Sequence, residues 1–274
     1  MKYGLELAAA GQRDAKVLGE LAHLAEDSGW DGIFLEDYIV YWDGGATFDP
    51  WIALAVMILQ TKRLVFGTTV TPIPRRRPWK LARELLTLDH LSDGRIILGV
   101  GLGDENEPGF AAVGETIDKK QRAKMLDESL EILAGLWSGA PFSYEGDCYQ
   151  ISEMTFQPKP VQQPRIPIWV GGHWPYRGPA ERAARWDGCI FSNCNKFTAE
   201  DVKQIKEFIA ERRISNAPYD IVVGGRRRPD DVGQERSYIK SLKDAGATWF
   251  LQYIPPMDIE ATKEQIREGP IYAD

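Results

Sequence analysis

The feature that most constrains the fold of this chain is a repeated alternation of short apolar runs with longer amphipathic stretches. Each apolar run is short and largely hydrophobic, as strands buried on both faces are. Eight such runs predict strands at residues 2–7, 32–35, 64–69, 96–100, 166–170, 189–192, 221–224 and 249–253. The alternating order predicts parallel strands that are joined by right-handed crossovers.

Helices are predicted between and after these strands, and their ends carry the expected residues. The predicted ranges are 15–28, 50–60, 78–91, 119–136, 179–185, 199–213, 230–245 and 258–268. Pro50 and Pro78 suit a first helical turn, and Gly29, Gly94 and Gly246 suit the left-handed position after a helix. Eight strands alternating with eight helices predict a (β/α)₈ TIM barrel, and 274 residues fit one barrel domain. An open doubly wound sheet is the alternative.

One segment interrupts this alternation. After the fourth predicted helix, residues 139–163 place aromatic residues among turn residues and end in a proline-rich stretch. We interpret this segment as an insertion that contains a β-hairpin. In a barrel it would lie either over the active-site mouth or at a subunit contact.

The charge balance and the cysteines narrow the class of partner. With 33 basic and 40 acidic residues, the formal net charge is −7, which argues against a general attraction to nucleic acid or to anionic lipid. No apolar stretch is long enough for a membrane span. Cys148, Cys189 and Cys194 lack metal-type spacing, so we expect structural cysteines, no metal site and a cytoplasmic protein with a small-molecule substrate.

In a barrel, the catalytic groups follow the strands, because the strand–helix loops form one face. The loop GVGLGD at 99–104 has glycines in a GxGxG pattern, which permits a flat ring or a phosphate to approach bare backbone. The loop WVGGHW at 169–174 directs backbone amides toward a phosphate, with His173 beside them. Arg75, Arg76 and Arg77 either contact an anionic cofactor or form a solvated loop.

These loops are rich in glycine and aromatic residues and poor in titratable groups, and they contain no nucleophile motif. Such a site is typical of a protein that positions a redox cofactor. Trp42, Trp169, Trp174 and Tyr38 would then form the walls around its ring system.

Several segments resemble the bacterial luciferase-like superfamily of flavin- and deazaflavin-dependent oxidoreductases. The strongest stretch covers residues 67–103, GTTVTPIPRRRPWKLARELLTLDHLSDGRIILGVGLG. Further matching segments are DSGWDGIFLED, LDESLEILAGLWSG, IPIWVGG and ARWDGCIFSN. The resemblance covers the chain from about Lys2 to Lys196 and is weak beyond that.

The resemblance implies a barrel, often dimeric, with FMN or the deazaflavin coenzyme F420 at the carboxyl ends of the strands. It implies a non-proline cis peptide at Thr68 and Thr69, and a phosphate near Gly171, Gly172 and Ser192. The cofactor-binding residues so predicted are Leu7, Thr68, Thr69, Gly99, Gly101, Trp169, Gly171, Gly172, His173 and Ser192.

The resemblance also suggests catalytic residues, with one departure. In the deazaflavin-dependent branch that acts on sugar phosphates, an Asp-His pair follows the second strand and a tryptophan lies a few residues later. Asp37 matches the aspartate and Trp42 matches the tryptophan, but Tyr38 stands at the histidine position. Asp104 stands where that branch has an acidic residue. We therefore take Asp37, Tyr38, Trp42 and Asp104 as the catalytic candidates.

Three classes of function remain open at this stage. The first is an oxidoreductase, either an FMN-dependent monooxygenase served by a separate flavin reductase or a deazaflavin-dependent hydride-transfer enzyme. FMN is the first choice of cofactor. The second is a non-catalytic flavin-binding protein, because the histidine is missing. The third is an unrelated barrel enzyme, such as an isomerase or aldolase, for which Lys196 is the only basic candidate at a strand end.

Overall fold

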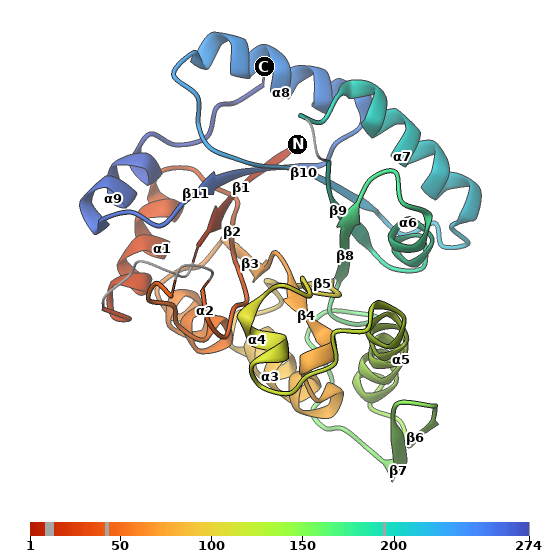
Figure 1. The fold of residues 1–274 in the computed structure, drawn as a ribbon. Coiled ribbons are helices and arrows are strands. Elements are labelled where there is room, and N and C mark those ends of the chain that lie inside the picture. The colour runs from red at the N-terminus through yellow and green to blue at the C-terminus, as the bar shows by residue number, and fades with distance from the viewer. Residues whose placement is uncertain (9–13, 42–43, 194–195, 274) are drawn as a thin grey trace.

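The computed structural model describes residues 1–8, 14–41, 44–193 and 196–273 as a closed barrel of parallel strands surrounded by helices (Figure 1). The barrel strands are β1 (Lys2–Leu7), β2 (Gly32–Leu35), β3 (Val65–Thr68) with its short continuation β4 (Thr71–Pro72), β5 (Ile96–Gly101), β8 (Ile168–His173), β9 (Gly188–Ser192), β10 (Asp220–Arg226) and β11 (Trp249–Ile254). Strand β1 pairs with both β2 and β11, and β3 pairs with β5, so the sheet closes on itself. The predicted TIM barrel is confirmed.

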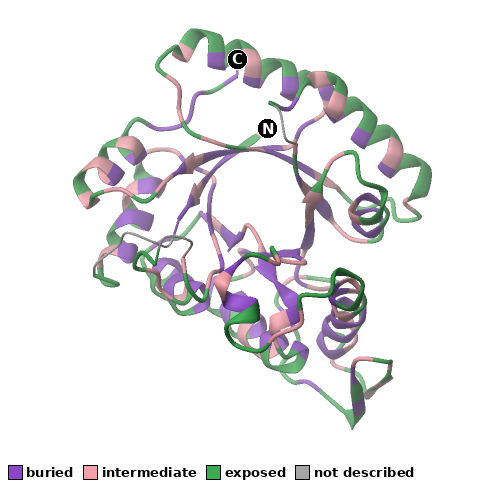
Figure 2. Cartoon of the chain, viewed as in Figure 1, coloured by how far each residue is buried: buried purple, intermediate pink, exposed green. Residues whose placement is uncertain are grey.

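The helices form the outer ring, and their apolar sides are buried against the strands (Figure 2). They are α1 (Val17–Asp27), α2 (Pro50–Leu59), α3 (Pro78–Leu91), α5 (Lys119–Trp137), α6 (Arg177–Ala183), α7 (Ala199–Arg212), α8 (Val232–Ala245) and α9 (Ile259–Arg267), with a short α4 (Pro108–Ala111) and a 3₁₀ turn η1 (Ile73–Arg75) in loops. Among the described residues, none of these helices combines the length and apolar character that a bilayer span requires.

Local chemistry fixes the helix ends close to their predicted positions. The carboxylate of Asp49 accepts hydrogen bonds from the amides of Trp51 and Ile52 at 3.0 Å, and Pro50 occupies the first turn of α2. At the other end of a helix, Gly246 adopts a φ of 118° after α8, a conformation that favours glycine.

Besides the larger core, a smaller cluster of apolar side chains fills the barrel interior. Phe34, Trp169 and Trp249 contact one another there, with ring centroids 5.2–5.5 Å apart. Glycines on the facing strands make room for these rings: a Cβ atom added to Gly188 would lie 2.5 Å from Trp169 Cδ1. The interior is therefore a packed core, and a cavity has room only above it.

The insertion contains the predicted hairpin. Strands β6 (Phe142–Glu145) and β7 (Gln150–Met154) pair antiparallel and lie beside α5, outside the barrel (Figure 1). The carboxylate of Glu128 on α5 holds the hairpin turn, because it accepts hydrogen bonds from the amides of Asp147, Cys148 and Tyr149.

Candidate functional site

A cavity of about 1050 Å³ opens at the carboxyl ends of the strands. Parallel strands bring their carboxyl ends to one face, so loops from distant parts of the sequence meet there. The lining comes from β1, β5, β8, β9, β10 and β11 and from the loops after β2, β3 and β5. The 139–163 insertion contributes no lining residue among those described, so the mouth is not where this hairpin lies.

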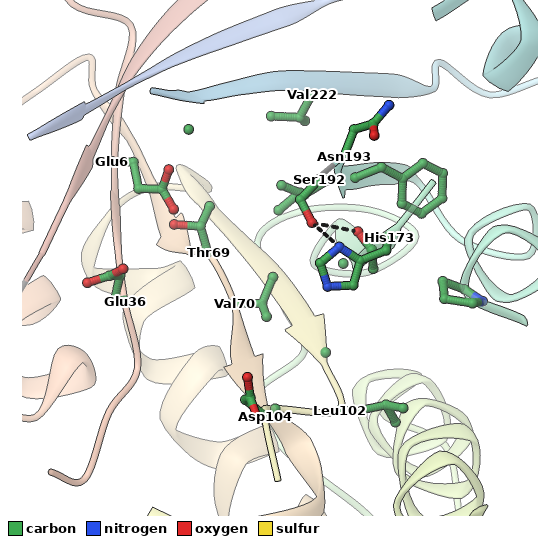
Figure 3. Close-up of a pocket in the computed structure, with 18 of the residues that line it drawn as sticks. Glu6, Glu36, Thr69, Val70, Leu102, Asp104, His173, Ser192, Asn193 and Val222 are labelled. Atoms are coloured by element: carbon green, nitrogen blue, oxygen red, sulfur yellow. Dashed lines mark hydrogen bonds between the residues drawn. The ribbon is translucent and has the colours of Figure 1, made fainter. Parts of the chain in front are cut away.

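Two carboxyl groups, Glu6 and Glu36, form one wall of the cavity (Figure 3). Side chains alternate along a strand, so Glu6 projects above Gly4, which faces Phe34 inside the barrel. Glu36 follows β2, two residues after Phe34. Burial raises the pKa of Glu6 to about 7, against a smaller lowering effect of the Thr69 hydroxyl. Burial and the charge of Glu6 raise the pKa of Glu36 to about 8.

A tyrosine of β11, Tyr253, pairs in register with Glu6 and lies next to this acidic wall. The hydroxyl groups of Tyr253 and Tyr41 lie 3.4 Å apart. Burial raises the pKa of Tyr253, and the hydrogen bond with Tyr41 and the charges of Glu36 and Glu6 add to that effect. Tyr253 therefore stays a neutral phenol beside the two carboxyl groups.

The opposite wall carries hydrogen-bonding groups. The hydroxyl of Ser192 lies 2.7 Å from His173 Nδ1, and both side chains are exposed to the cavity (Figure 3). They come from the ends of β9 and β8, which pair in register at this position. The two walls thus differ in chemistry: one bears carboxyl groups, and the other bears a hydroxyl and an imidazole.

Two cations lie further along the second wall. Lys196 Nζ sits 3.5 Å from the centroid of the Tyr238 ring, and Arg226 lies over the same ring. The buried carboxylate of Glu235 is 4.0 Å from Lys196 and 3.6 Å from Arg226. One carboxylate faces two cations, so this part of the lining carries a net positive charge that suits an anion.

Val70 rests on glycines in the middle of the mouth. A Cβ atom on Gly101 would lie 2.6 Å from Val70 Cγ2, and one on Gly171 would lie 2.8 Å from Val70 Cγ1. These glycines therefore admit the Val70 side chain. The peptide bond between Thr69 and Val70 is cis, one residue later than the Thr68–Thr69 position that the sequence suggested.

Asp37 occupies a different environment from the one expected for a catalytic acid. Its side chain is fully buried, and Arg76 binds it through Nε and Nη2 at 3.0 and 2.6 Å. Arg75 contacts the Asp37 carbonyl oxygen, its carboxylate and the carboxylate of Glu107. Arg75 and Arg76 therefore do not lie in a solvated loop, which corrects that alternative, and neither is among the described residues that line the cavity. Arg77 is exposed.

Other predicted residues lie below the cavity, and strand geometry explains why. Trp169 is fully buried in the barrel interior, with its indole N–H donating to Asp220 at 3.2 Å. It points inward two residues before Gly171, which corrects the expectation that it walls the ring. Leu7 faces the helices, with Leu18 and Ala53 around it. Thr68 donates to the carbonyl of Gly99 at 3.0 Å, and both are packed beneath the mouth.

The remaining predicted residues that the structure describes do reach the cavity. Tyr38, Thr69, Gly172 and Asp104 are among the lining residues, and the Asp104 carboxylate accepts a hydrogen bond from the amide of Asn106 at 2.8 Å. Trp42 lies outside the described residues. In the described part of the chain, no group of three or more His, Cys, Asp or Glu side chains converges as a metal site.

Sequence reasoning did not single out Glu6 or Glu36 as functional residues. The signal for Glu6 was present: it is the one acidic residue in the apolar run KYGLEL. A carboxylate inside a strand buried on both faces calls for a functional explanation, because burying it carries a large penalty.

The sequence of this chain matches a known protein family. The family model described as luciferase-like monooxygenase matches residues 4–231. An F420-dependent glucose-6-phosphate dehydrogenase of Nakamurella multipartita is 33% identical over 174 residues, 61% of this chain and 50% of the relative. An uncharacterised protein of Mycobacterium bovis is 30% identical over 193 residues, 69% of this chain and 65% of the relative. The chain thus spans about half the length of the dehydrogenases it matches.

Solved structures agree on the fold. An F420-dependent secondary alcohol dehydrogenase in complex with an F420-acetone adduct superposes with a TM-score of 0.81 at 19% identity, covering 100% of this chain and 99% of the other. The monooxygenase RslO1 from Streptomyces bottropensis gives a TM-score of 0.78 at 19% identity, covering 97% of each chain. The barrel and the extent of the family match together identify the chain as a member of the luciferase-like monooxygenase family.

Proposed function

We propose that this protein is an oxidoreductase that binds a flavin-type cofactor in the cavity at the strand ends, and that it transfers hydride between a deazaflavin and a small alcohol or carbonyl compound. The observation that carries this proposal is the division of one cavity into a carboxyl wall and a cationic, hydrogen-bonding wall. The dependence of the curated dehydrogenase relatives on F420 supports the choice of a deazaflavin.

The residues present fit such a cofactor. The cavity of about 1050 Å³ lies at the upper end of ordinary small-molecule sites, with room for a tricyclic ring and a substrate. The Val70 side chain, which packs on Gly101 and Gly171, offers an apolar surface for a ring. His173 and Ser192 would bind the phosphate. Lys196, which lines the same cavity, would neutralise part of the negative charge of the phosphate.

When bound, the cofactor supplies a carbon centre that accepts or releases hydride. The protein's own residues then have three tasks. Ser192 and His173 orient the anionic part, the Val70 surface excludes water from one ring face, and the carboxyl wall exchanges the proton that accompanies hydride transfer.

Binding and turnover of the two cofactors test the proposal. We expect purified protein to quench F420 fluorescence with a Kd in the micromolar range or tighter, and to bind FMN more weakly. His173→Ala should weaken F420 binding roughly tenfold through loss of a polar contact to the phosphate. His23→Ala, on the exposed face of α1, is the matched control and should bind as the wild type does.

Two other outcomes of that experiment have defined meanings. Tight FMN binding with oxygen-dependent turnover would instead favour the monooxygenase, with a separate reductase as partner. Tight binding without turnover of any alcohol or carbonyl compound would favour a non-catalytic flavin-binding protein, which the buried ion pairs of Asp37 and the tyrosine at position 38 both support. Failure to bind either cofactor would refute the proposal.

We also propose a homodimer, with α2 in its interface. Ile52 and Leu59 are 70% and 65% exposed, and Val56 lies between them on the same face of the helix. Exposed apolar residues in one stripe are typical of a protein contact. Light scattering after gel filtration should give the mass of a dimer, and Ile52→Glu combined with Leu59→Glu should give a monomer. A wild-type protein of monomer mass would contradict this assignment.

A further inference from the structure

Glu6 and Glu36 project from two strands that are directly paired. Strands β1 and β2 are parallel neighbours, with Leu7 opposite Leu35, and the amide of Glu36 donates to the Leu7 carbonyl at 3.4 Å. Glu6 pairs with Phe34 in this register, and Glu36 lies two residues beyond Phe34 on the same side of the sheet. The two side chains therefore project from neighbouring strands onto one wall of the cavity (Figure 3). Glycine leaves space for one of them: a Cβ atom at Gly225 would lie 3.2 Å from Glu6 Oε2.

Within the described residues, neither carboxyl group has a cationic partner within 4 Å. In the part of the chain that the structure describes, the titratable groups that act on the pair are the two carboxyl groups themselves and the phenol of Tyr253, which pairs with Tyr41. Glu36 Oε2 is buried without a hydrogen-bond partner, and the Thr69 hydroxyl lies beside the Glu6 carboxyl group (Figure 3). Two like charges that are this close and this poorly solvated cannot both form readily, so one carboxyl group keeps a proton that the other can share.

We propose that Glu6 and Glu36 form one acid–base pair that holds a single proton near neutral pH and exchanges it with the substrate hydroxyl during the redox step. This inference rests on the proposed function. It assigns proton transfer to these two residues instead of Asp37, whose carboxylate is fully engaged by Arg75 and Arg76.

The chemistry balances for an alcohol substrate. The O–H bond breaks and its proton passes to the carboxylate of the pair, while the C–H bond breaks and its electron pair leaves with the hydrogen as hydride. The alcohol is oxidised to a carbonyl compound, and the flavin-type cofactor of the proposed function is the oxidant. The pair then releases the proton to water in the open cavity.

The test combines a measurement on the cofactor-free protein with one on the enzyme. In the wild type, infrared spectroscopy should detect a protonated carboxyl band that titrates between about pH 6 and 9, as the raised pKa values of about 7 and 8 require. Glu36→Gln and Glu6→Gln should each remove the coupled titration. Glu145→Gln, on the exposed face of the hairpin, should leave it unchanged.

With cofactor and an alcohol substrate, Glu36→Gln should lower kcat about 10²- to 10⁴-fold. It should also abolish the rise of kcat with pH near 7, while the Kd for the cofactor stays within about twofold. Glu6→Gln provides a second neutral variant of the same shape, should the first fail to fold.

The outcomes separate the inference from the function on which it rests. Absence of the infrared band in the wild type, or an unchanged pH profile in a cofactor-bound Glu36→Gln enzyme, would overturn the acid–base pair alone. If the wild type fails to bind cofactor, the proposed function is overturned. The infrared titration of the cofactor-free protein would still show whether Glu6 and Glu36 share a proton.

Discussion

Glu36 and Asp37 are neighbours in the sequence, both carry carboxyl groups, and both lie at the mouth of the barrel, yet their environments are opposite. Asp37 is buried against Arg75 and Arg76, which bind its carboxylate and its carbonyl oxygen. Glu36 lines the cavity beside Glu6, and one of its oxygens is buried without a partner. The first carboxylate ties loops together, and the second is available for chemistry.

The difference teaches that the partner, and not the residue type, decides what a carboxyl group does at this face. A buried carboxylate that binds a guanidinium is held in an ion pair, and its role is structural. A buried carboxyl group beside another carboxyl group holds a proton, because the charged pair is too costly. Substitutions that remove a partner from either group therefore test the comparison directly.

The largest effect on stability should follow the loss of Arg75. This side chain is 1% exposed and serves both Asp37 and Glu107, so Arg75→Met would leave a buried carboxylate without its cation. We expect the free energy of unfolding to fall by about 3–5 kcal/mol. Urea denaturation measures the change, and Glu107→Gln in the Arg75→Met background should recover part of it, since the unpaired charge is then gone.

The adjacent arginine supplies the control for this prediction. Arg77 is exposed and lies outside this ion-pair network, so Arg77→Met should change the free energy of unfolding by no more than about 0.5 kcal/mol. Equal losses for Arg75→Met and Arg77→Met would show that the network does not hold the loops, and the contrast between Asp37 and Glu36 would lose its basis.

The contrast also explains which parts of the molecule could be predicted from sequence. The strands and helices were predicted to within a few residues, because apolar periodicity, prolines and capping residues are local signals. The ion pairs of Asp37 were not, since Arg75 lies 38 residues away and only the folded barrel brings the two together.

Side-chain direction was the second limit. Trp169 and Gly171 belong to one strand and face the same interior, but at different heights, so only Gly171 reaches the cavity. Glu6 and Leu7 face opposite sides of β1. Leu7 was predicted to contact the cofactor, but it faces the helix layer, and its neighbour Glu6 faces the cavity. The sequence shows that side chains alternate along a strand. Which residues face the barrel interior, and how far each lies from the cavity, depends on the register with the other strands.

A smaller effect should appear in the pH dependence of stability. The folded state raises the pKa of Glu6 and Glu36 from 4.5 to about 7 and about 8, so it keeps protons that the unfolded chain has released. Above pH 4.5 the folded state therefore binds more protons, and the free energy of unfolding falls as pH rises toward 8. The slope is at most about 1.4 kcal/mol per pH unit for each retained proton.

Comparing the wild type with Glu36→Gln isolates the contribution of the coupled pair, because titrating groups that do not interact with Glu36 cancel in the difference. Glutamine cannot ionise, so the variant should gain stability relative to the wild type steadily from pH 5 to pH 8, as followed by thermal unfolding at each pH. Above pH 8 the difference should level off, since both states have then lost the proton. A difference that stays flat from pH 5 to pH 8 would mean that Glu36 is already ionised in the folded state, and the contrast between Glu36 and Asp37 would then fail.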